Sequence, residues 1–168
     1  MEDNYIYFEL DNRKLKINKE NPDDILMLKT HGGRGKLKNP FWNQIKVQTN
    51  KQKGYRIIHI KPKTYYLHRI NYYAHNPTWD IHNSSTDNSI DHENKDKTNN
   101  HIENLRVLTH RENLFNTNSK GYSWNKLCQK WTAQIGVNGK KKHLGCFDLE
   151  EDARTAYLEA KKIYHNIK

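Results

Sequence analysis

The sequence predicts an α+β protein made of small modules, and three observations support this fold class. Apolar residues make up only 34% of the 168 residues, which is too few for one large core, so units of roughly 50 to 60 residues are expected. In the middle of the chain, two short strand-like segments flank a polar loop and precede a helix start. In the last part, strand-like alternation is followed by helical spacing, which predicts three antiparallel strands packed on one helix.

The composition excludes several classes of protein. No run approaches the roughly 20 apolar residues of a membrane span, and the acidic start, MEDNYIYFEL, lacks the features of a signal peptide. Two cysteines are too few for a disulfide scaffold or a four-cysteine zinc site. The 29 Lys and Arg outnumber the 19 Asp and Glu, which gives a formal charge of +10. We therefore expect an intracellular protein that contacts nucleic acid and no membrane, in the host cytoplasm or nucleus if a virus or mobile element encodes it.

Residues 1–40 form an N-terminal segment whose role the sequence leaves unclear. Tyr5–Phe8 and Ile25–Leu28 are each expected to form a short strand. The run His31–Lys36 is rich in glycine, but Leu37 stands where a phosphate-binding loop needs Ser or Thr. We interpret this run as a mobile glycine turn.

Residues 41–116 contain the expected central domain. Asn43–Thr49 and Tyr55–Lys61 flank a polar turn, which predicts a hairpin. Leu67, Ile70, Tyr73 and Ala74 recur at helical spacing within Tyr66–His75, and Asn76-Pro77 ends that helix. Residues 79–89 are polar and read as a loop.

The chemistry-bearing residues of the central domain follow this loop. Asp91 and His92 end one short strand, and Arg106–Leu108 form another. A helix is expected to begin near His110, which places Asn113 in its first turn. This ββα arrangement can bring Asp91, His92 and Asn113 together.

Such a group suits phosphodiester hydrolysis. Carboxylate and amide oxygens are ligands for a hard ion such as Mg²⁺, which stabilises charge on the phosphate and the leaving 3′-oxygen. A histidine that binds no metal can deprotonate the attacking water near neutral pH. Ordinary turn and cap roles for the same three residue types are the alternative.

The spacing of these residues resembles the HNH homing-endonuclease signature, a ββα-metal nuclease. The resemblance is carried by Asp91-His92, Asn99-Asn100, Ile102–Leu105 and Asn113, with the upstream Tyr55–Lys61 and Leu67-His68-Arg69. It implies that His92 is the general base, that Asp91 and Asn113 hold one Mg²⁺ or Mn²⁺ ion per active site, and that Asn104 braces the loop and orients His92. Arg69 is a candidate for DNA contact, with packing at the helix start as the alternative.

The last block, residues 122–168, follows a short linker at residues 117–121. Trp131, Ala133, Ile135 and Val137 alternate with polar or small residues, and Asn138-Gly139 is a strong signal for a hairpin turn. Lys140–Cys146 is the partner strand, and the apolar residues after Asp148 recur at helical spacing. Six lysines and no acidic residue lie within residues 119–147, which predicts a basic surface, with a merely solvated lysine-rich face as the alternative.

This block resembles the AP2 domain of ERF-type transcription factors, a DNA-binding module. The resemblance is carried by Lys120–Trp124, Lys130–Ile135, Asn138–Lys140, His143–Asp148 and Glu151–Tyr157. It implies that the sheet enters the major groove of duplex DNA. The candidate DNA-binding residues are Lys120, Lys130, Gln134, Lys141, Lys142 and His143. Ser123, Asn125 and Gly136 replace arginines that read bases in the plant proteins, so the base preference does not carry over.

Together these patterns predict a site-specific DNA endonuclease that uses one divalent metal ion and a His general base and is targeted by an AP2-like sheet. One ββα unit offers one active site, so we expect a monomer that nicks double-stranded DNA and needs no small-molecule cofactor. The alternative is a sequence-specific DNA-binding regulator whose HNH fold is catalytically inert. A zinc site built from Cys128, Cys146 and His143 is a further alternative, but no CxxC pair supports it.

Overall fold

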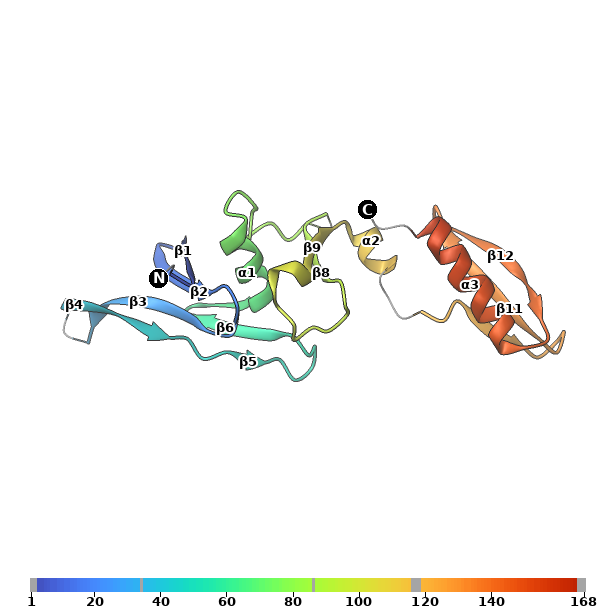
Figure 1. The fold of residues 1–168 in the computed structure, drawn as a ribbon, viewed down its shortest axis with the longest axis horizontal. Coiled ribbons are helices and arrows are strands. Elements are labelled where there is room, and N and C mark those ends of the chain that lie inside the picture. Colours follow the sequence, from blue (N-terminus) through green and yellow to red (C-terminus); the bar gives the residue numbers. More distant parts are fainter. Residues whose placement is uncertain (1–2, 34, 86, 116–118, 166–168) are drawn as a thin grey trace. The chain divides into compact units, whose positions relative to one another are not determined.

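The computed structural model describes residues 3–33, 35–85, 87–115 and 119–165. The chain divides into two compact units, Met1–Thr109 and His110–Lys168, and each is described by itself. Both strands and helices occur in each unit (Figure 1), which confirms the expected α+β class. Within the described ranges, no helix has the length and apolar character that crossing a membrane requires.

The first unit begins with a four-stranded antiparallel sheet. Its strands are β1 (Tyr5–Leu10), β2 (Arg13–Asn18), β3 (Ile25–Gly32) and β4 (Gly35–Gln44), paired in that order. The two strands that the sequence predicts here are present as parts of β1 and β3. In the glycine-rich run, Gly32 of β3 pairs with Gly35 of β4, and Arg34 lies outside the described residues. Strands β2 and β4 were not expected.

One face of this sheet contributes to the main hydrophobic core. Leu15, Ile17 and Ile25 are completely buried there and belong to the same cluster as Ile58 and Ile70 from the segments that follow. Alternation explains the choice of face, because Leu15 and Ile17 lie between exposed or partly exposed basic and polar residues of β2. Residues 1–40 therefore share a core with the central domain.

The next elements are a small sheet and a helix. The strands β5 (Gln48–Thr49), β6 (Arg56–Ile60) and β7 (Lys63–Tyr66) pair in that order, and α1 (Leu67–His75) follows directly. The helix lies within one residue of its predicted bounds. The predicted hairpin is present only as the two-residue pairing of β5 with β6, because Asn43 and Gln44 belong to β4. The longer pairing is between β6 and β7.

The central motif consists of short elements. β8 (Ser89–His92) pairs antiparallel with β9 (Leu105–Leu108), and a 3₁₀ turn (Ile102–Asn104) precedes β9. The register places Asp91 opposite Arg106 and His92 opposite Leu105. The helix α2 (His110–Phe115) begins where the sequence predicts it and belongs to the second unit.

The second unit ends with three strands and a long helix, as the sequence predicts. β10 (Tyr122–Asn125), β11 (Lys130–Val137) and β12 (Lys140–Phe147) form an antiparallel sheet. The helix α3 (Glu150–Tyr164) covers one face of it (Figure 1). Ala133 and Ile135 of β11 are buried on that face, as are Ala153 and Tyr157 of α3.

Candidate active site and nucleic-acid interface

His92 lies at the end of β8, and only 5% of it is exposed. Its Nε2 lies 3.1 Å from Oδ1 of Asn100, which is itself buried. Asn100 donates through Nδ2 to the carbonyl of Thr98 at 3.1 Å, so its oxygen is the atom that faces the ring. An amide oxygen only accepts hydrogen bonds, and Nε2 of His92 must therefore carry a proton and donate it.

This hydrogen bond determines the tautomer of the candidate base. When the ring is neutral and Nε2 carries the proton, the basic lone pair is at Nδ1. Burial lowers the pKa of His92 below its ordinary value, and this effect outweighs the opposing influence of Asn100 and Asp91. At neutral pH the side chain is therefore the neutral form that general-base catalysis requires.

Aromatic rings pack around His92. Its ring centroid lies 5.1 Å from that of His68 and 5.9 Å from that of Tyr55. His68 is buried, stacks on Tyr66 and has an Nδ1 atom without a hydrogen-bond partner in the described structure. Burial, with a smaller effect of His92, lowers the pKa of His68 to about 3. His68 is thus a neutral packing partner of the candidate base.

Asn104 holds the loop that follows His92. Its side-chain oxygen accepts from the backbone N–H of Asn94 at 3.0 Å, and its Nδ2 donates to the carbonyl of Asn99 at 2.8 Å. Its own carbonyl accepts from the N–H of Glu93 at 3.0 Å. These three bonds connect the start and the middle of the loop to the last residue of the 3₁₀ turn before β9. The predicted role of Asn104 in orienting His92 stays a prediction.

Asp91 is buried beside Arg106. Nε and Nη2 of Arg106 both lie 3.1 Å from Oδ2 of Asp91, and Nη1 lies 4.0 Å from Glu93. Cross-strand pairing of Asp91 with Arg106 in the β8–β9 register explains this contact. Asp91 thus supplies one buried carboxylate directly next to His92 in the sequence.

The donor types fit a hard divalent cation, because Asp91 offers carboxylate oxygens and Asn113 an amide oxygen. Asn113 lies in α2 of the second unit, so its meeting with Asp91 stays a prediction. Among the residues that the structure describes, no three His, Cys, Asp or Glu side chains are grouped to hold a metal ion. Cys128, Cys146 and His143, the alternative zinc ligands, are among these described residues.

The comparisons with known proteins address this segment directly. Residues 65–114 match the model of a family described as HNH endonuclease. Residues 65–114 form an HNH endonuclease domain. Enzymes of this family are phosphodiester hydrolases, so the predicted enzyme class is confirmed, and the family implies DNA as the substrate. No curated protein and no solved structure matches the chain.

Arg69 of the HNH domain is occupied by contacts within the protein. Its guanidinium donates to the carbonyls of Asn88 at 3.1 Å, Ile81 at 2.7 Å and Asn83 at 3.0 Å. It also lies 4.6 Å from the ring centroid of Trp79. Arg69 therefore holds the loop at residues 79–89 against the start of α1, which is the structural alternative that the sequence leaves open.

Sequence reasoning missed several partners within the HNH domain. Asn100 belongs to the HNH signature, but the sequence predicts no role for it. The contact of Arg106 with Asp91 was not predicted either. Asn71 of α1 was also missed, although it is buried and donates to the carbonyl of Asn100 at 2.8 Å. The signal for Asn71 was an amide directly after Ile70 and three residues before Ala74, on the buried side of the helix.

Beyond the HNH domain, the sheet of the second unit presents several of the predicted DNA-binding residues. Gln134 of β11 is exposed and lies opposite His143 of β12, also exposed, just after a register shift. Lys130 is partly exposed and forms an ion pair with Asp148 at 3.2 Å. Lys120 lies 3.9 Å from Glu150, with an exposed side chain.

Two neighbouring lysines of β12, Lys141 and Lys142, lie on opposite sides of the sheet. Lys141 is exposed and lies opposite Gly136. Lys142 lies opposite the buried Ile135, and its ammonium donates to the hydroxyl of Tyr164 in α3 at 2.6 Å. Lys142 is therefore on the helix side of the sheet, whereas Gln134 and His143 share the opposite side.

Proposed function

We propose that this protein is a site-specific DNA endonuclease that hydrolyses a phosphodiester bond with His92 as its general base. The observation that carries the proposal is the buried, neutral His92 within the matched HNH segment, with the carboxylate of Asp91 next to it. A neutral imidazole in a fixed tautomer is what proton removal from water at neutral pH requires.

His92 receives the proton of the attacking water at Nδ1. Asn100 accepts the hydrogen bond from Nε2 and so keeps the ring in this tautomer, and it stabilises the imidazolium that forms. Asn104 holds the loop after His92 through three bonds, which limits movement of the base. General-base assistance of this kind contributes roughly 10²- to 10⁴-fold to the rate.

Asp91 and Asn113 are the proposed ligands of one Mg²⁺ or Mn²⁺ ion. When bound, this ion supplies stabilisation of the negative charge on the phosphate and on the leaving 3′-oxygen. Arg106 fixes the orientation of the Asp91 carboxylate through a hydrogen bond from Nε and an ion pair from Nη2, both to Oδ2. The protein is proposed to act as a monomer.

The sheet β10–β12 is proposed to bind duplex DNA in the manner of an AP2 domain. Three antiparallel strands on one helix support this proposal, as do the exposed Gln134 and His143 on the side away from α3. Lys120, Lys130 and Lys141 are proposed phosphate contacts, since ammonium groups position a protein on DNA without reading bases. Lys130→Ala or Gln134→Ala is expected to weaken DNA binding and leave cutting at high protein concentration.

Incubation of the purified protein with supercoiled plasmid DNA tests the nuclease proposal. We expect relaxed or linear product with Mg²⁺, none with EDTA, and none for His92→Ala. His59→Ala is the matched control, because His59 is exposed and bonds only Thr64 in the described structure. Equal product from His92→Ala and the unmodified protein would refute the role of His92.

The same experiment separates the nuclease from the alternative function. A regulator with an inert HNH fold would bind duplex DNA but give no product with Mg²⁺ or Mn²⁺ on any of several plasmids and genomic fragments. The filled positions Asp91, His92 and Asn113 favour the nuclease over this alternative.

A further inference from the structure

A long part of the first unit carries positive charge without any negative charge. Residues 25–79 contain none of the chain's 19 Asp and Glu, and the next acidic residue is Asp80. The same residues contain eleven of the 29 Lys and Arg. These are Lys29, Arg34, Lys36, Lys38, Lys46, Lys51, Lys53, Arg56, Lys61, Lys63 and Arg69. A single-sign stretch of this length produces a positive field that attracts phosphate.

The β3–β4 hairpin, which we name the hairpin arm, is exposed mainly along β4. Every residue of β4 except Leu37 and Trp42 is exposed. The core contacts of the arm come from the base of β3, where Ile25 is buried and Met27 packs against the core. Figure 1 shows β3 and β4 running together away from α1 to a narrow two-stranded end.

The lysines of the arm are available to an external partner. Lys29, Lys36 and Lys38 are exposed, and within the described part of the chain none of them forms an ion pair. Lys29 lies 5.9 Å from the ring centroid of Phe41, its partner across the strands. Other basic residues are used inside the fold, as Arg56 is by Asp23.

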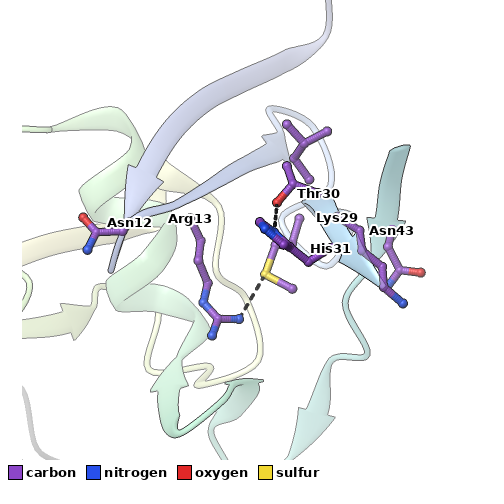
Figure 2. Close-up of a pocket in the computed structure, with 8 residues that line it drawn as sticks. Asn12, Arg13, Lys29, Thr30, His31 and Asn43 are labelled. Carbon is purple, nitrogen blue, oxygen red and sulfur yellow. Dashed lines mark hydrogen bonds between the residues drawn. The ribbon is translucent and has the colours of Figure 1, made fainter. Parts of the chain in front are cut away.

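A pocket beside the arm is lined by residues 27–31 of β3, by Asn43 of β4 and by Asn12 and Arg13 (Figure 2). It has a volume of about 520 Å³, and none of its lining residues is acidic. Arg13 reaches into it and is held by the carbonyl of Lys61 at 2.7 Å and by the sulfur of Met27 at 3.8 Å. His31 bonds to Thr30 at 2.9 Å on the same lining (Figure 2).

We propose that the hairpin arm binds duplex DNA, with Lys29, Lys36 and Lys38 on backbone phosphates and the pocket beside β3 against the same backbone. A two-stranded antiparallel ribbon fits the major groove of B-form DNA, whereas the major groove of A-form RNA is too narrow. The choice of DNA rests on the proposed function. The arm lies in the first unit, so it is a contact distinct from the sheet of the second unit.

Binding measurements on the full chain with His92→Ala, in EDTA, test this proposal without cleavage. The test variant is Lys29→Gln/Lys36→Gln/Lys38→Gln. The control variant, Lys14→Gln/Lys19→Gln/Lys162→Gln, removes the same charge from exposed lysines outside residues 25–79. Affinity for a fluorescently labelled duplex is measured by anisotropy over a range of salt concentrations, after thermal unfolding has established that both variants fold.

The slope of log affinity against log salt gives the answer. Loss of three phosphate contacts reduces the slope by about 2.7, because each contact contributes about 0.9. The control variant is expected to change the slope by less than the value of one phosphate contact, about 0.9. Hydroxyl-radical footprinting is expected to show one DNA backbone segment that loses protection only with the arm variant. Equal slopes for the two variants would overturn the proposal, as would tighter, lysine-dependent binding to an RNA duplex.

The outcome does not depend on catalysis. If the unmodified protein fails to cut DNA but the slope falls in the arm variant alone, the nuclease proposal fails and the arm proposal stands. If the unmodified protein cuts DNA with Mg²⁺ but the arm variant keeps both slope and footprint, the arm proposal fails and the nuclease proposal stands.

Discussion

Replacement of Asn100 tests the catalytic reasoning most directly, because Asn100 touches the candidate base through one atom. Oδ1 of Asn100 accepts from Nε2 of His92 at 3.1 Å, and both residues are buried. Asn100→Ala removes this acceptor and leaves Nε2–H buried without it. Asn100→Asp keeps the acceptor and adds a negative charge at the same place.

The magnitudes follow from the burial of the pair. A buried polar group that loses its partner costs about 1–3 kcal/mol. If that cost falls on the transition state, in which the ring becomes positively charged, the plateau rate of Asn100→Ala decreases about 5- to 150-fold. Asn100→Asp keeps a hydrogen bond, so its plateau is expected to change less.

The pH dependence has opposite signs in the two variants. The bond to Asn100 raises the pKa of His92 against the larger lowering effect of burial. Its loss in Asn100→Ala therefore lowers the pKa further, and the acid limb of the rate profile moves to lower pH. A carboxylate in Asn100→Asp stabilises the imidazolium, so the pKa rises and the acid limb moves to higher pH.

Single-turnover cleavage at saturating Mg²⁺, from about pH 5 to pH 9, measures both the acid limb and the plateau of the rate profile. Gln52→Glu serves as a control, because it makes the same amide-to-carboxylate change at an exposed turn. Identical acid limbs in Asn100→Ala, Asn100→Asp and the unmodified protein would refute the assignment of His92 as the base held by Asn100.

Three further changes probe the stability of the two units. The pKa of His68 is about 3 in the folded chain, so between about pH 6.5 and pH 5 only the unfolded chain binds a proton at this residue. The free energy of unfolding therefore falls by about 2 kcal/mol from pH 6.5 to pH 5. Urea titrations are expected to show this loss for the unmodified protein and not for His68→Phe. Gly121→Ala would place a Cβ 2.0 Å from the ring of Tyr157 at a φ of +64°, so a loss of about 2 kcal/mol or more is expected, seen as a lower Tm of the second unit. Arg69→Lys removes the planar guanidinium that binds three carbonyls. It is expected to lower the free energy of unfolding by about 2 kcal/mol and to speed amide exchange at residues 81–88. Unchanged exchange there would contradict the role of Arg69 in holding this loop.

The second unit was predictable because its signals are local. Asn138 and Gly139 have φ values of 50° and 76°, as the hairpin turn between β11 and β12 requires. The start of α3 shows the limit of such signals. Asp148 and Glu151 suggest a capping box, but Leu149 is the N-cap without a side-chain bond, and Asp148 pairs with Lys130 instead.

The N-terminal sheet was only partly predictable because its strands contribute few apolar residues each. β2 buries just Leu15 and Ile17 between basic and polar residues, and β4 has no buried residue. Such strands form because distant segments complete the core, which a local pattern does not reveal.

The candidate site was also predictable only in part. Asp91 and His92 are adjacent in the sequence, and their residue types suggest the chemistry directly. Their partners Asn100 and Arg106 follow from a loop closure and a strand register, which exist only in the folded chain.

The amides around the candidate base have a consequence for how the protein responds to its surroundings. Asn71, Asn100 and Asn104 hold His92 and the loop after it through amide and backbone groups. Amides neither gain nor lose protons in the pH range where a histidine titrates. A fall in pH over the range in which the chain stays folded would therefore charge the base while these amide contacts persist, so inactivation by mild acid should be immediate and fully reversible, with no slow structural recovery when the pH is restored.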